Sequence, residues 1–109
     1  MKSLSKELDE IAGEIVRSRG ACEKCGRSDR VLQWAHIVGR KAIRIRWALD
    51  NAFCLCHPCH FRFTNYPHEF YKFVEEKHGK DHLSNLTRRA NDFSYKIDHK
   101  KILKELEQY

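Results

Sequence analysis

The chain has 109 residues, of which 41% are hydrophobic and 33% are charged. This length is typical of one small domain, which buries only about two-thirds of the surface its unfolded chain exposes, so a metal or a disulfide would help to hold it. No apolar run approaches the roughly 20 residues that cross a bilayer, and residues 1–10 are too acidic for a signal peptide. We therefore expect a soluble cytoplasmic protein with no membrane partner.

The charge is unevenly distributed along the chain. The net charge is +6, from 21 Lys and Arg against 15 Asp and Glu. Residues 17–46 alone hold nine basic and two acidic side chains, a local balance of +7. Such a concentration favours a polyanionic partner, with nucleic acid as the first candidate, although a solvated charged surface is the alternative.

The first predicted element is an amphipathic helix over residues 3–19, capped by Ser3 or Ser5 and ending near Gly20. We expect this helix to pack rather than to do chemistry. Cys22, Cys25 and the following glycine then predict a tight turn that presents two thiolates.

A β-hairpin is predicted next. Residues 31–38 form an apolar, β-branched run that indicates a strand, and residues 52–55 are its predicted partner. The connection, residues 39–51, is long and basic, as loops that bind a ligand often are. Within it residues 42–47 alternate in polarity, so that a strand or an extended loop would turn Arg44 and Arg46 the same way.

Helices are predicted for the rest of the chain. The first runs from His57 to about residue 64, the second covers 67–78 and ends at a glycine, a weaker third covers 81–90, and the last covers 98–108 with Asp98 as its cap. We expect a single domain, 1–109, with a core at about 20–66, an N-terminal helix at about 3–19 and C-terminal helices at about 67–108.

A second C-x-x-C pair completes a metal-binding pattern. Cys56 and Cys59 join Cys22 and Cys25, and four thiolates satisfy a closed tetrahedral zinc site. Redox and iron–sulfur roles are the alternatives. The gap of 30 residues between the pairs is longer than in a zinc ribbon, so a folded element must lie between them. Cys54 is predicted to be a small buried strand residue.

Two stretches resemble a known family. The runs Ala35-His36-Ile37 and Asp50 to His60 are similar to the HNH endonuclease superfamily in its zinc-bearing form. Gly39, Arg40, Arg46 and Trp47 extend the likeness to the small HNH proteins of tailed phages, including the NinG-type recombination proteins, which would place the chain in the host cytoplasm. The resemblance implies an α+β fold: a small zinc-stapled ββα-metal (His-Me finger) core with flanking N-terminal and C-terminal helices.

The resemblance also implies site residues. His36 would be the general base, His60 a ligand of a catalytic Mg²⁺ or Mn²⁺, and Asn51 a residue that orients the hairpin loop. Two positions depart from the family pattern, because Ala35 and Thr64 stand where many relatives have metal ligands. A replacement ligand would have to come from elsewhere, for example from Asp50, His57 or His68. Otherwise the ion would bind loosely through His60, Asn51, which is a ligand in some relatives, waters and the substrate phosphate.

The expected function is metal-dependent hydrolysis of DNA phosphodiester bonds by an HNH endonuclease, with DNA as the partner. The basic loop would contact phosphates through Arg40, Lys41, Arg44 and Arg46. The alternative is a non-catalytic zinc-knuckle module that binds DNA or a protein. The oligomeric state stays open.

Overall fold

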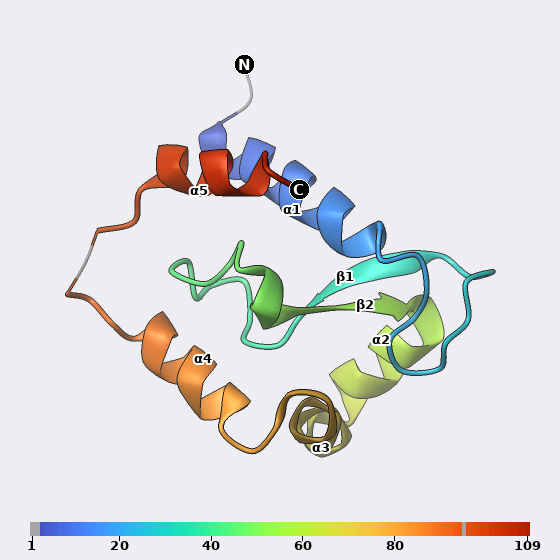
Figure 1. Ribbon diagram of the computed structural model, residues 1–109. Helices are drawn as coiled ribbons and strands as arrows, with labels where there is room; N and C mark the ends of the chain where they lie inside the picture. The colour runs from blue at the N-terminus through green and yellow to red at the C-terminus, as the bar shows by residue number, and fades with distance from the viewer. Residues whose placement is uncertain (1–2, 95) are drawn as a thin grey trace.

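A two-stranded hairpin lies at the centre of the molecule, and a helix follows it directly (Figure 1). The computed structural model describes residues 3–94 and 96–109. Its elements are α1 (Leu4–Arg17), β1 (Leu32–His36), the 3-10 turn η1 (Leu49–Asn51), β2 (Ala52–Cys56), α2 (His57–Asn65), α3 (Pro67–His78), α4 (His82–Ala90) and α5 (His99–Leu106). The predicted α+β class with a ββα core and flanking helices is confirmed.

The hairpin has two faces with different partners. β1 and β2 are antiparallel, and their register runs from Leu32 opposite Cys56 to His36 opposite Ala52. Trp34 lies on one face and packs with α1, whereas Ala35 lies on the other face, which the aromatic side chains of α2 and α3 cover. The hairpin is thus a thin layer between two groups of helices.

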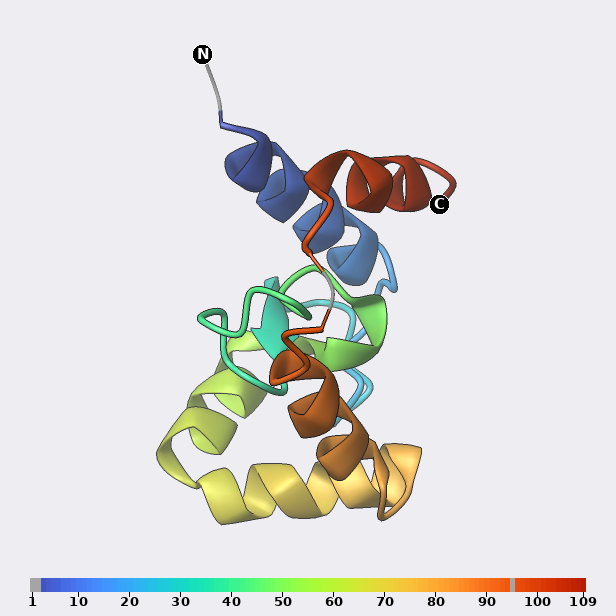
Figure 2. The same cartoon turned by 90° about the vertical axis from the view of Figure 1, so that its left-hand side faces the viewer.

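The terminal helices lie together on one side of the hairpin, while α2, α3 and α4 lie on the other (Figures 1 and 2). Ser3 caps α1, accepting a hydrogen bond from the Lys6 N–H at 3.2 Å. Leu8 and Leu106 join α1 to α5 in one apolar cluster. No helix within the described ranges is long and apolar enough to span a bilayer.

The boundaries of the other helices follow the predicted signals. α2 has a proline in its first turn and ends before Pro67, which begins α3. Gly79 ends α3 with a φ of +91°, a conformation that other residues rarely adopt. The side chain of Asp98 caps α5 by accepting from the Lys101 N–H at 3.1 Å.

The conformation predicted for residues 42–47 is wrong. The segment is neither strand nor extended loop but a series of turns, in which the Ile45 N–H bonds the Ala42 carbonyl and the Ala48 N–H bonds the Ile45 carbonyl, both at 3.1 Å. Apolar and basic residues alternate in this segment because its turns bury side chains at intervals, not because its backbone is extended. Arg44 and Arg46 consequently diverge. Arg46 reaches Asp9 of α1, and the Arg44 guanidinium lies 4.1 Å from the centre of the Phe93 ring.

Candidate functional site

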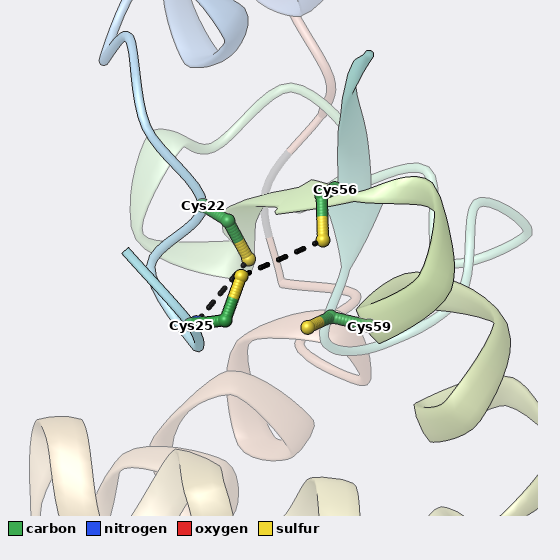
Figure 3. A group of neighbouring side chains, drawn as sticks. All are labelled: Cys22, Cys25, Cys56 and Cys59. Carbon is green, nitrogen blue, oxygen red and sulfur yellow. Dashed lines mark hydrogen bonds between the residues drawn. The ribbon is translucent and has the colours of Figure 1, made fainter. Parts of the chain in front are cut away.

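Four cysteines converge where the first turn meets the hairpin and α2 (Figure 3). Cys22 and Cys25 come from the turn before β1, Cys56 ends β2, and Cys59 lies in the first turn of α2. Their sulfur atoms all lie within 4.8 Å of one another, and the sulfurs of Cys25 and Cys56 are 3.7 Å apart. Zinc–sulfur bonds of about 2.3 Å require sulfur separations of about 3.8 Å in a tetrahedron, so this group fits a zinc ion.

The backbone of the first turn is shaped to present its two sulfurs. The Cys22 N–H donates to the Arg27 carbonyl at 2.9 Å, and the Gly26 N–H donates to the Cys22 carbonyl at 2.8 Å. Gly26 adopts a φ of +80°, which explains the glycine after the second cysteine. The Cys25 N–H also faces the Cys22 sulfur at 3.5 Å, as expected for a turn that stabilises thiolates.

The pKa values of the cluster indicate that four thiolates need a bound cation. Burial raises the pKa of the Cys56 thiol, but hydrogen bonds from Cys59 and from the Arg30 guanidinium outweigh it and bring the pKa to about 6. Burial and the neighbouring sulfurs of Cys56 and Cys22 hold the pKa of Cys59 above its ordinary value. All four sulfurs can therefore be thiolates only around a positive ion. Cys54 is buried outside the cluster, as predicted.

His36, at the end of β1, is held by the loop backbone. Its Nε2 lies 2.9 Å from the Arg46 carbonyl oxygen, and its ring centroid is 4.2 Å from that of Trp34. Because a carbonyl only accepts, Nε2 carries the proton of the neutral ring and Nδ1 is the basic nitrogen. Burial lowers the pKa of His36, as do the nearby guanidinium groups, although the bond to the Arg46 carbonyl opposes the shift. The ring is therefore neutral at neutral pH.

Asn51 braces the loop between the strands. Its side chain is fully buried, and its Oδ1 accepts from the Val38 N–H at 2.7 Å. Its Nδ2 donates to the carbonyls of Val38 and Ile45, at 3.0 and 3.1 Å. The amide thus joins the two ends of the loop that leads from His36 to β2, and its hydrogen-bonding groups are engaged by the backbone.

His60 is oriented by a glutamine on β1. The Oε1 of Gln33 accepts from Nδ1 of His60 at 2.8 Å, and its Nε2 donates to Nδ1 of His57 at 3.2 Å. The proton of His60 then sits on Nδ1, and Nε2 keeps the lone pair that binds a metal. Metal-binding histidines are commonly oriented by such a hydrogen bond from the other ring nitrogen. Burial lowers the pKa of His60, and the nearby His57 adds to the shift.

The predicted catalytic residues do not form one cluster. The contacts of His36 lie on the hairpin face toward α1, whereas Gln33, the partner of His60, lies on the opposite face. Within residues 3–94 and 96–109, the four cysteines are the one group of three or more His, Cys, Asp or Glu side chains close enough to hold a metal. Thr64 donates to the His60 carbonyl at 2.9 Å and Asp50 pairs with Arg89 at 2.7 Å, so neither completes a site at His60.

The basic loop is partly engaged within the protein. Arg46 donates through Nε and Nη2 to the carboxylate of Asp9, and Arg40 adds a contact of 3.1 Å to the same group. Lys41 is exposed, and Arg44 lies against the Phe93 ring. Two of the four predicted phosphate-binding side chains thus dock the loop on α1.

Asp9 is the residue that the sequence did not indicate. It also accepts from Nε1 of the buried Trp47 at 2.9 Å. Burial raises the pKa of Asp9, but hydrogen bonds from Arg46 and Trp47 outweigh it and lower the pKa overall. An acid in the first half of a helix is normally explained by the helix dipole, so no signal in the sequence marked this one out.

Comparisons with models of protein families, with curated proteins and with solved structures find no match. The fold and the cysteine cluster define the class by themselves: this is a small α+β protein that fits a zinc-binding ββα-like module.

Proposed function

We propose that this protein is a metal-dependent endonuclease that hydrolyses DNA phosphodiester bonds. The observation that carries the proposal is the orientation of His36, a neutral imidazole held at Nε2 by the Arg46 carbonyl and bordering an open cleft of about 380 Å³. Nδ1 of this ring takes the proton of the attacking water as the water oxygen bonds to phosphorus and the bond to the leaving sugar oxygen breaks. A general base typically contributes about 10² to 10⁴ in rate.

The catalytic ion would rest on His60. Nε2 is the one side-chain ligand that this histidine site supplies, so water and substrate phosphate would complete the coordination. Because His60 and His36 lie on different faces of the hairpin, the ion would neutralise charge on the phosphate only where the DNA reaches both histidines. A single imidazole suits Mn²⁺ better than Mg²⁺, which prefers oxygen ligands, so we expect weak metal binding and higher activity with Mn²⁺.

A second candidate is a non-catalytic zinc module that binds DNA or a protein. It is favoured by Ala35, which is buried where the family pattern often has a ligand, and by the separation of His36 and His60 on the two hairpin faces. Both candidates keep the zinc cluster. Only the first candidate cuts a phosphodiester bond.

The test is cleavage of supercoiled plasmid by the zinc-loaded protein with Mg²⁺ or Mn²⁺. The wild type should yield nicked or linear DNA, and His36→Ala should lose about 10² to 10⁴ of the rate at every metal concentration while keeping its zinc and its unfolding temperature. His60→Ala should be partly rescued by Mn²⁺. His78→Ala, a change at an exposed histidine at the end of α3, is the matched control.

Two results would overturn the proposal. One is a wild-type protein that binds plasmid in a gel but cuts none with Mg²⁺, Mn²⁺ or Ni²⁺, which would establish the second candidate. The other is a His36→Ala variant that cuts as fast as the wild type.

A further inference from the structure

The cleft beside His36 is built largely by a helix outside the ββα core. Its walls come from α1, from the end of β1 and from the start of the basic loop. The lining residues are Lys6, Asp9, Glu10, Arg17, Trp34, His36 and Arg40. Three of these are cations, and they line the same cleft as the ring that the proposed function uses as its base.

Two of the cations belong to one face of α1. Lys6 and Arg17 are 11 residues apart, with Glu10 and Gly13 between them at helical spacing, so they mark the two ends of one stripe. At 1.5 Å per residue this stripe is about 16 Å long. One strand of B-form DNA rises about 3.4 Å per nucleotide, so a stripe of this length can follow several successive phosphates.

These cations are available to an anion. Within the described parts of the chain, no ion pair joins Lys6 or Arg17 to an acid. Arg40 contacts Asp9 but is 60% exposed, and a pair so exposed contributes little to stability. The Asp9 carboxylate is already engaged by Arg46 and Trp47. Glu10 is the other acid that lines the cleft.

Gly13 makes room for the Arg17 guanidinium. A Cβ at position 13 would lie 2.8 Å from Nη1 of Arg17 and 3.3 Å from Cε3 of Trp34. The guanidinium therefore folds back over the helix beside Trp34, whose ring neighbours His36. Glycine is unfavourable inside a helix, so a glycine at a buried position of α1 requires a packing reason. The space that it leaves for the Arg17 guanidinium provides that reason.

We propose that the cleft between α1 and the end of β1 holds the sugar-phosphate backbone of the DNA, with Lys6 and Arg17 of α1 as phosphate contacts beside His36. This inference rests on the proposed function, because it takes DNA as the substrate. It assigns substrate positioning to a helix that the sequence pattern marks only for packing. Contacts of this kind position the backbone and read no base sequence.

The test is the salt dependence of binding to a fluorescent 20-base-pair duplex, measured by anisotropy without added divalent metal. The double variant Lys6→Gln/Arg17→Gln should flatten the slope of log affinity against log salt by about two units, because each lost phosphate contact removes about 0.9. The matched control is Lys72→Gln/Arg88→Gln, which removes the same charge from exposed positions on α3 and α4. An equal change in both double variants would overturn the cleft as the binding site.

Two further variants test separately the position of the Arg17 guanidinium and the charge of the cleft. Gly13→Ala keeps every charge but displaces the guanidinium, so we expect affinity to fall several-fold with the unfolding temperature kept. Glu10→Gln removes one negative charge from the lining of the cleft and should tighten the binding of an anion. Wild-type affinity in Gly13→Ala would overturn the placement of Arg17, and weaker binding in Glu10→Gln would overturn an anion in the cleft.

The cleft can be ruled out as the DNA-binding site without ruling out the nuclease, and the reverse is also true. A protein that cuts no DNA but shows the flattened slope in Lys6→Gln/Arg17→Gln retains the cleft and overturns the nuclease. A protein that cuts plasmid but keeps the wild-type slope in that variant retains the nuclease and overturns the cleft.

Discussion

The two sides of the hairpin are held by opposite kinds of polar centre. On the α2 side, four sulfurs from segments far apart in the chain gather into a group that fits a zinc ion. On the α1 side, one carboxylate, that of Asp9, gathers Arg40, Arg46 and Trp47. A metal centre is a strong, closed cross-link, whereas an ion pair at a partly exposed site is weak and screened by salt.

The proposed base, His36, lies on the weaker, α1 side of the hairpin. Arg46 is the link: its carbonyl holds His36, and its guanidinium holds Asp9. The position of the proposed base therefore depends on how well α1 is docked. A zinc ion in the cysteine cluster would fix where α2 and His60 stand, whereas the Asp9 carboxylate, through Arg46, fixes where His36 stands.

Loss of the metal should have the largest effect. Binding free energies of structural zinc are about 10 to 16 kcal/mol and count as folding free energy in so small a domain. We expect Cys22→Ser, or a strong chelator, to unfold the protein, as followed by circular dichroism and metal analysis. Cys54→Ala should keep one zinc per chain, since that thiol lies outside the cluster. A folded Cys22→Ser protein without zinc would contradict this.

Removal of the Asn51 amide should come next. The side chain is fully buried, and Asn51→Ala would leave the N–H and carbonyl of Val38 and the carbonyl of Ile45 without their partner. Buried unsatisfied groups cost about 1 to 3 kcal/mol each, and with partial relaxation of the loop we expect a total of about 3 kcal/mol in urea unfolding. Asn65→Ala, at an exposed asparagine that bonds only within its own helix, should cost less than about 1 kcal/mol.

The Asp9 centre should be less important for stability but more important for His36. The carboxylate is 19% exposed, so Asp9→Asn should cost about 2 kcal/mol, below the 3 to 5 of a fully buried pair. Plasmid cleavage should fall by more than this loss explains, because Arg46 and its carbonyl shift. Glu7→Gln removes an exposed acid of the same helix as the control. Cleavage unchanged in Asp9→Asn would show that His36 is positioned without α1.

Lowering the pH should remove the stabilisation that the Asp9 carboxylate gives to the wild-type protein. The pKa of Asp9 is lowered in the folded protein, from an ordinary value of 3.8. The folded state therefore binds this proton less readily than the unfolded state, so the stabilisation is fully present above pH 3.8 and is lost as pH falls through the folded pKa. The difference in stability between the wild type and Asp9→Asn should shrink over that range. A difference that stays constant with pH would exclude the charge of Asp9 as its origin.

The sequence predicted one of these centres and not the other for a physical reason. Paired cysteines are rare and their spacing is tied to a tight turn, so Cys22, Cys25, Cys56 and Cys59 identify the cluster before any fold is known. The boundaries of the helices also depend on local signals, such as the prolines of α2 and α3. Asp9 meets Arg46 only because α1 crosses the loop, and such a contact has no local pattern.

The same reason explains the wrong prediction for residues 42–47. Ile45 and Trp47 are buried, and their alternation with arginines is also what a strand would show. The turns that form instead are selected by the fixed points around the loop, the Asn51 amide and the Asp9 carboxylate. Both are long-range contacts, made over 13 and 37 residues of chain to Val38 and Arg46.

The smallest expected effects come from replacing, one at a time, the two arginines that bind the Asp9 carboxylate. Arg46 is 23% exposed and makes two hydrogen bonds to the carboxylate, whereas Arg40 is 60% exposed and makes one. Arg40→Gln should therefore cost less than about 0.5 kcal/mol in urea unfolding, and Arg46→Gln should cost about 1 to 2 kcal/mol. Raising the salt concentration should reduce the effect of Arg40→Gln further, because its pair is screened, and should leave most of the effect of Arg46→Gln. Equal costs for the two variants would mean that burial does not set the strength of this centre, and the contrast with the zinc side would then rest on the metal alone.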